Sequence, residues 1–126
     1  MPLQEVTIGD DAGLSCQLSR GGVLVPINTS ATVRAAIVTK DKKKRMSSVV
    51  TINNAGLGND WANGLVRVVI LAADQNTTET ESNTVKNIES GLAMLEVEVN
   101  DQSQSPGNRL NSWHEHVMVN NAAING

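Results

Sequence analysis

The sequence predicts an all-β chain, folded as a single immunoglobulin-like β-sandwich of about seven to eight strands with long polar loops. Valine, threonine and other strand-forming residues alternate with polar ones over short runs, and Gly, Asn and Asp bound those runs. The sequence shows no alternation of helices and strands of the kind that would indicate a parallel sheet. Because 126 residues suffice for one hydrophobic core, we expect one domain over residues 1–126.

The first half of the chain is expected to form five strands. They are predicted at Gln4–Ile8, Leu14–Ser19, Val23–Ile27, Ala31–Thr39 and Ser47–Ile52. Pro26 lacks a backbone donor and therefore suits a sheet edge or a strand end. The Ala31–Thr39 run is apolar enough to lie centrally, and together with Ser47–Ile52 it predicts a hairpin with a basic tip.

The second half is expected to form three strands and three polar loops. The strands are predicted at Leu65–Leu71, Leu92–Val99 and Ser112–Val119, and the loops at Asn53–Gly64, Asp74–Asn87 and Asp101–Asn108. A short helical turn near Glu79–Ile88 is an alternative within the second loop. In Leu92–Val99 the odd-numbered residues are apolar and two even-numbered ones are glutamates, which predicts one solvated face.

The chain contains two tryptophans and no tyrosine or phenylalanine. Surfaces that stack sugars or single-stranded bases use several aromatic rings, so this composition argues against recognition by stacking. Trp113 alternates with Val117 and Val119, which predicts that it fills the core. Trp61 lies in a loop rich in Gly and Asn and is the better candidate for an interface.

Charge and hydropathy exclude further classes of partner. The net charge of −3 gives no global attraction for phosphate backbones or anionic lipid, so neither a specific nucleic acid nor a membrane is an expected partner. The apolar runs are shorter than the roughly 20 residues that span a bilayer. The first residues show no secretory signal pattern, and we expect folding in the cytoplasm. Cys16 falls on an apolar strand face and is expected to be buried.

Residues with catalytic or metal-binding chemistry are sparse, and we predict no enzyme and no cofactor. His114 and His116 are separated by one residue and share a strand face, which makes them weak metal candidates without an evident third ligand. Glu96 and Glu98 are expected to form a solvated face. The pair Asp10 and Asp11 fits a turn better than a cation site completed by other acids such as Glu5 or Asp101.

A basic segment holds half of the chain's ten cationic residues: Lys40, Lys42, Lys43, Lys44 and Arg45. It has two interpretations. Its like charges suit a solvated hairpin tip that discourages edge-to-edge association. Alternatively, it forms a protruding cationic surface that binds an acidic partner surface, or packaged nucleic acid, with salt-sensitive strength. On the second interpretation, these five residues and Trp61 are the candidate partner-binding residues.

The order of motifs resembles the N-terminal domain of bacteriophage baseplate upper proteins and related small β-sandwich modules of phage tails, necks and fibres. The resemblance is carried by Ile8-Gly9-Asp10 before Leu14–Leu18, by the segments Gly21–Ile27 and Ala31–Ile37, by the Gly91–Val99 strand and by the returning strand Trp113–Val119. Leu92 stands where that family has an aromatic residue. Longer family members also continue past the equivalent of Gly126 into receptor-binding or trimerising regions.

The resemblance implies a non-enzymatic virion structural protein that attaches or forms tail, neck or baseplate fibres. Its expected partners are other virion proteins and further copies of itself, most simply in a trimer, with Gln4–Ile8 and Asn120–Gly126 as exchangeable segments. The alternatives are a capsid cement (decoration) protein, a soluble carbohydrate-binding module, and an enzyme that uses a metal at His114 and His116.

Overall fold

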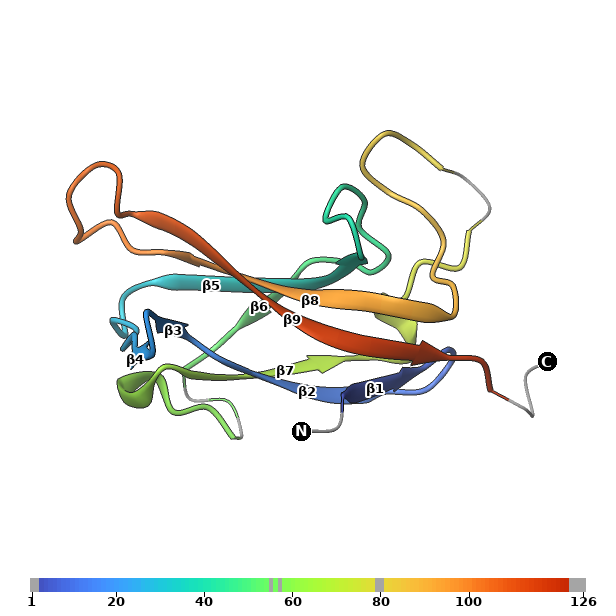
Figure 1. Ribbon diagram of the computed structural model, residues 1–126, viewed down its shortest axis with the longest axis horizontal. Helices are drawn as coiled ribbons and strands as arrows, with labels where there is room; N and C mark the ends of the chain where they lie inside the picture. Colours follow the sequence, from blue (N-terminus) through green and yellow to red (C-terminus); the bar gives the residue numbers. More distant parts are fainter. Residues whose placement is uncertain (1–2, 55, 57, 79–80, 123–126) are drawn as a thin grey trace.

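The computed structural model describes residues 3–54, 56, 58–78 and 81–122. Within these residues, two β-sheets pack face to face, as Figure 1 shows with β5, β8 and β9 of the larger sheet above β2 and β7 of the smaller. The prediction of an all-β sandwich is therefore confirmed.

The larger sheet has five strands in the order β1–β9–β8–β5–β6. Their bounds are β1 Gln4–Thr7, β9 Leu110–Asn120, β8 Gly91–Asn100, β5 Thr32–Thr39 and β6 Val50–Ile52. The edge strand β1 runs parallel to β9, and the other neighbours are antiparallel. β5 lies inside the sheet, as its apolar sequence predicted.

The smaller sheet pairs β2 (Ala12–Gln17) with β7 (Leu65–Ile70) in antiparallel register. Two short strands, β3 (Ser19–Arg20) and β4 (Val23–Leu24), form a side hairpin. Two 3₁₀ turns flank β7: η1 (Trp61–Asn63) and η2 (Ala72–Asp74). With β2 and β7 in one layer and β5, β8 and β9 in the other, the chain follows the immunoglobulin order, in which strands B and E face strands C, F and G.

The core lies between the inner faces of the two sheets. Valine, isoleucine, leucine and alanine fill it, as alternation along the strands requires: Val33, Ala35 and Ile37 of β5, Ala93, Leu95 and Val97 of β8, and Val66, Val68 and Ile70 of β7. The predicted position of Cys16 is confirmed, since this thiol is 1% exposed. Its burial among apolar side chains, with a smaller effect from Glu115, raises the pKa of the thiol to about 12.

Two strands are shorter than alternation predicted: β6 begins later than Ser47, and β4 ends before Ile27. Before β6, the buried side-chain hydroxyl of Ser47 accepts from the backbone N–H of Ile37 (2.9 Å), and the regular pairing of β6 with β5 begins only at Val50. After β4, the N–H of Ile27 donates to the carbonyl of Trp61 (2.8 Å). The stretch after η2 is a loop, as predicted, and the described residues 81–88 contain no helix.

Trp61 is buried where an interface position was predicted, and Trp113, predicted to fill the core, is partly buried and packs against it. Trp61 is 3% exposed and belongs to the core. The loop before β7 folds inward there, because Trp61 starts η1 and its indole Nε1 donates to Oδ1 of Asn59 (3.3 Å). Trp113 is only half-buried at the end of the sandwich, where its Nε1 donates to the carbonyl of Ser19 (3.1 Å). The Arg20 guanidinium lies 5.2 Å from its ring centroid.

Candidate partner-binding face

Two projections flank the outer face of the five-stranded sheet. Figure 1 shows the β8–β9 connection rising at one end, and the segment 40–49 and the described residues of the loop after η2 (75–78 and 81–90) rising at the other. All three point away from the β2–β7 layer. The outer face of the sheet therefore lies between two projections.

The basic segment Lys40–Arg45 forms a tight turn at the end of β5. The N–H of Thr39 donates to the carbonyl of Lys44 (2.8 Å), and the N–H of Lys42 donates back to the carbonyl of Thr39 (2.8 Å). The Asp41 carboxylate accepts from the Thr39 hydroxyl (2.5 Å) and from the N–H of Lys43 (3.0 Å). These two hydrogen bonds, the hydroxyl first, lower the pKa of Asp41. The carboxylate of Asp41 therefore helps to fix the conformation of this turn.

Backbone hydrogen bonds fix the other side of this segment to the loop that follows η2. The N–H of Arg45 donates to the carbonyl of Thr84 (2.8 Å), and the carbonyl of Arg45 accepts from the N–H of Lys86 (3.1 Å). The next residue, Met46, is buried and donates to the carbonyl of Ile37 (2.8 Å). The predicted hairpin with a basic tip is confirmed, and this tip is held on both flanks. We call residues 40–45 the basic turn.

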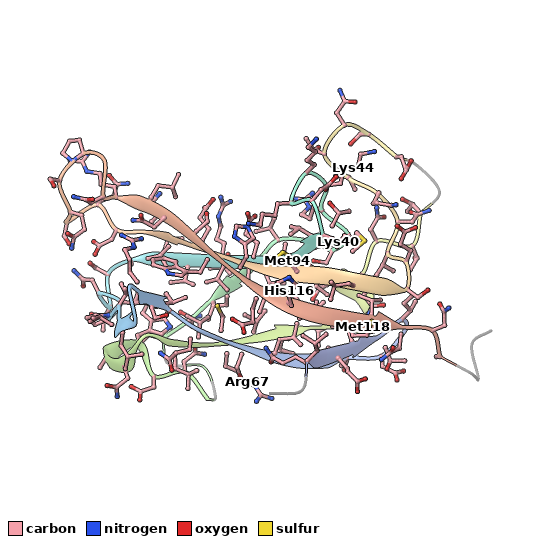
Figure 2. All side chains as sticks on the ribbon, viewed as in Figure 1. Lys40, Lys44, Arg67, Met94, His116 and Met118 are labelled. Atoms are coloured by element: carbon pink, nitrogen blue, oxygen red, sulfur yellow. The ribbon has the colours of Figure 1, made fainter. Side chains whose placement is uncertain are left out.

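The basic turn presents a concentrated positive charge. Lys40, Lys42 and Lys43 are exposed, and Lys44 and Arg45 are half-buried. Figure 2 shows Lys44 near the outer end of the turn and Lys40 closer to the sheet. The Arg45 Nε atom is buried and has no hydrogen-bond partner within the described residues. Since Asp41 is the only acid among these six residues, the turn carries a formal charge of +4, that is, five cations less one acid.

A cleft of about 250 Å³ lies between the basic turn and the outer face of the sheet. One wall is formed by residues 42–45, and Thr84 also lines it. The floor of the cleft is formed by Ala36 and Val38 of β5 and by Glu96 and Glu98 of β8. The small side chains of Ala36 and Val38 leave room for the cleft above them. The five predicted cationic partner residues therefore lie beside a hollow; four of them line it, and Lys40 is outside its lining.

The glutamates of the floor are paired with neighbouring strands. Arg34 of β5 donates to Oε1 of Glu98 from both Nη2 (2.6 Å) and Nε (3.1 Å). His114 of β9 lies 2.9 Å from Oε1 of Glu96 through its Nε2. The prediction of a simply solvated glutamate pair is therefore incomplete, because each acid faces its own basic register partner. With histidine counted as neutral, Arg34 offsets one of the two glutamates of the floor, and the positive charge of the cleft comes from the basic turn.

The other candidate residues do not converge on this cleft. Within the described ranges, no three His, Cys, Asp or Glu side chains gather as a metal site would require. Asp11 accepts from the N–H of Ala72 (2.8 Å), as expected of a turn residue. Asp101 lies at the opposite end of the β8–β9 pair and organises its connection by accepting from Ser103. Trp61, expected at an interface, is buried in the core, so that prediction is wrong.

Comparison with known proteins adds no further assignment. The chain matches no model of a protein family, and no curated protein or solved structure was found to be similar to it. Among the residues that the structure describes, no helix has the length and apolar character needed to cross a membrane.

Proposed function

We propose that this chain is a structural protein of a bacteriophage virion, a module that attaches or forms fibres of the tail, neck or baseplate. The basic turn is the contact site for an acidic surface of another virion protein. The observation that carries the docking role is the fixed shape of that turn, whose backbone is hydrogen-bonded to β5 on one flank and to the loop 84–86 on the other. The motif order that resembles baseplate modules supplies the virion setting.

Preorganisation supports a binding role for the basic turn. Holding like charges in a fixed array costs free energy through repulsion, and a partner with complementary charge would remove that cost. Because the turn is already ordered, a partner does not need to order it on binding.

The structure offers less support for the carbohydrate-binding alternative. Trp61 is buried, and one face of Trp113 is covered by the guanidinium of Arg20, 5.2 Å from the ring centroid. Sugar recognition by stacking needs an open aromatic face. The capsid cement alternative uses the same basic turn against a different acidic surface, so the location of the protein on the particle separates the two.

We also propose that the module works as a homo-oligomer, most simply a trimer. Short sandwiches with an edge strand at the terminus associate by strand exchange or edge pairing. β1 is such a strand, because it lies at the edge of its sheet and pairs only with β9 there. Light scattering of the purified chain at micromolar concentration tests this part, and a monomer throughout would contradict it.

The location is tested by immunogold electron microscopy of purified phage particles, with antibodies raised against the folded chain. Labelling at the tail, neck or baseplate is the expected result. Labelling over the whole head would replace the proposal with the cement alternative. If mass spectrometry of the purified particles found no peptide of this chain, the virion assignment would be wrong.

A further inference from the structure

Both histidines of the chain and two of its four methionines lie on one face of the β8–β9 pair. In the register of these strands, Met94 is directly opposite His116, and His114 is directly opposite Glu96. Met118 follows His116 by two residues on the same strand and therefore points to the same side. Figure 2 labels Met94, His116 and Met118 along this part of the sheet.

We propose that Met94, His116 and Met118 form a binding site for a soft monovalent metal ion, Cu(I). A thioether and an imidazole are neighbours across the strands, and a second thioether is their neighbour along β9. This inference is independent of the proposed virion role, since it rests on a different set of side chains.

The spacing allows three ligands to meet at one ion. Directly opposed residues of antiparallel strands have Cβ atoms about 5 Å apart. Alternate residues of one strand are separated by about 7 Å. Methionine has three rotatable side-chain bonds, so its sulfur can adjust to an ion without movement of the backbone. A compact site is therefore accessible from the existing register.

The donor set selects the kind of metal. Thioether sulfur is a soft ligand that favours Cu(I), while imidazole suits several transition metals, and hard cations such as Mg²⁺ prefer oxygen. The nearby carboxylates each have a neighbour at one oxygen: Oε1 of Glu96 lies 2.9 Å from Nε2 of His114, and Oε1 of Glu5 accepts from Asn120 (3.3 Å). The trio itself supplies two thioether sulfurs and one imidazole nitrogen, a set that favours a soft ion.

The exposure of the three side chains suits entry from solvent. His116 is exposed and Met118 is half-buried, while Met94 is 6% exposed. An ion captured by the imidazole would therefore pass to thioether ligands that are already withdrawn from water. His114 contributes less, because its Nε2 is committed to Glu96.

Competition with a chromophoric Cu(I) chelator, bicinchoninate, tests the site with the whole purified chain under anaerobic, reducing conditions. We expect one equivalent of Cu(I) to be withdrawn from the chelator. We expect Met94→Leu, Met118→Leu and His116→Gln each to weaken binding by about tenfold or more, the scale on which even outer-shell changes act. Met46→Leu is the matched control, because this methionine is buried in the core away from β9 and its loss should leave the affinity unchanged.

A second measurement keeps the proposal testable if a variant folds poorly. Titration of the unaltered chain with Ag(I), a redox-inert mimic, should shift the NMR signals of the methyl groups of Met94 and Met118 and leave that of Met46 in place. Failure of the unaltered chain to compete with the chelator would overturn the proposal. Binding that survives both methionine substitutions and is lost with His114→Asn would also overturn it, because the ligands would then be the two histidines.

Discussion

The side-chain carboxamide of Gln4 pairs with the backbone of Ser15 as a neighbouring strand would. Nε2 of Gln4 donates to the carbonyl of Ser15 (2.7 Å), and the N–H of Ser15 donates to Oε1 of Gln4 (2.6 Å). The register partner of Ser15 on β7 is Arg67, whose N–H donates to Oδ1 of Asn59 (2.9 Å) on the far side of the ribbon. One row of the β2–β7 ribbon is therefore closed at both edges by amide side chains.

This closure restricts how copies of the chain can associate. An open strand edge attracts further strands, and proteins commonly block such edges. Here Gln4 and Asn59 occupy the backbone groups that a strand of another molecule would need. Edge pairing is therefore blocked at this row of the β2–β7 ribbon, and Gln4, which blocks it on one side, belongs to the edge strand β1 of the larger sheet.

Replacing Gln4 with alanine should destabilise the protein. The Gln4→Ala variant loses both hydrogen bonds to Ser15, and we expect the free energy of unfolding to fall by about 1–2 kcal/mol. Urea unfolding measures this change. The matched control is Gln102→Ala, which removes an exposed amide bonded only to the side chain of Asn100 and should change stability by less than about 0.5 kcal/mol. Equal effects in the two variants would contradict the role assigned to Gln4.

Local sequence pattern predicted most strands and the core, because each depends on alternation within a few residues. β8 shows this alternation over residues 95–99, and the continuous apolar run of β5 at residues 35–38, buried on both faces, marked it as a central strand. The sequence could not reveal which residues of distant strands face one another, and Gln4 with Ser15, Glu98 with Arg34 and Met94 with His116 are all pairings of that kind. Local alternation also does not predict that a loop folds into the core, and for this reason the sequence did not predict the burial of Trp61.

Because Trp61 is buried and Trp113 is half-buried, replacing each with alanine should lower the free energy of unfolding by different amounts. Trp61→Ala should lower the free energy of unfolding by about 3–5 kcal/mol, because it leaves a large cavity in the core. Trp113→Ala should cost roughly 1–2 kcal/mol, through the loss of the hydrogen bond to Ser19 and of the stacked Arg20.

Fluorescence quenching checks the same assignment in variants that keep the fold. Acrylamide should quench the remaining Trp113 of a Trp61→Phe variant more strongly than the remaining Trp61 of a Trp113→Phe variant. The opposite order would restore the prediction from sequence that Trp113 is the core ring.

The Cys16 thiol should be inert in the folded protein. Its pKa is raised to about 12, so at pH 8 the thiol is protonated as well as buried, and iodoacetamide should modify it only after unfolding. The unfolded chain ionises near pH 9 and the folded chain does not, so stability should fall as the pH rises from 9 towards 12. A Cys16→Ala variant should lose this slope, and rapid labelling of the folded chain at pH 8 would show that the thiol is accessible.

Two aspartates should contribute to stability loss in acid. Hydrogen bonds lower the pKa of Asp101, chiefly from the hydroxyl and the N–H of Ser103, and those from Thr39 and Lys43 lower the pKa of Asp41. A lowered folded pKa stabilises the protein above the ordinary value of 3.8, and the benefit is lost as the pH falls through the folded value. Carboxyl-carbon NMR titration should give both midpoints below 3.8, and a midpoint at or above that value would contradict the hydrogen bonding described.

Neutralising the basic turn should weaken docking without unfolding the chain. We expect a variant with Lys42→Gln, Lys43→Gln and Lys44→Gln to keep its melting temperature, since backbone groups and Asp41 hold the turn. Its incorporation into phage particles should fall, and docking of the unaltered chain should weaken as salt rises, because exposed charges are screened.

The matched control for this variant is Lys86→Gln. Lys86 lies beside the basic turn, and its ammonium is already paired with Glu89 (2.6 Å), so its removal should leave incorporation unchanged. An ordinary level of incorporation of the triple variant, in particles where the protein is located at the tail, would reject docking through the basic turn while leaving the virion role intact. A similar loss in both variants would mean that general surface charge, and not the shape of the turn, governs assembly.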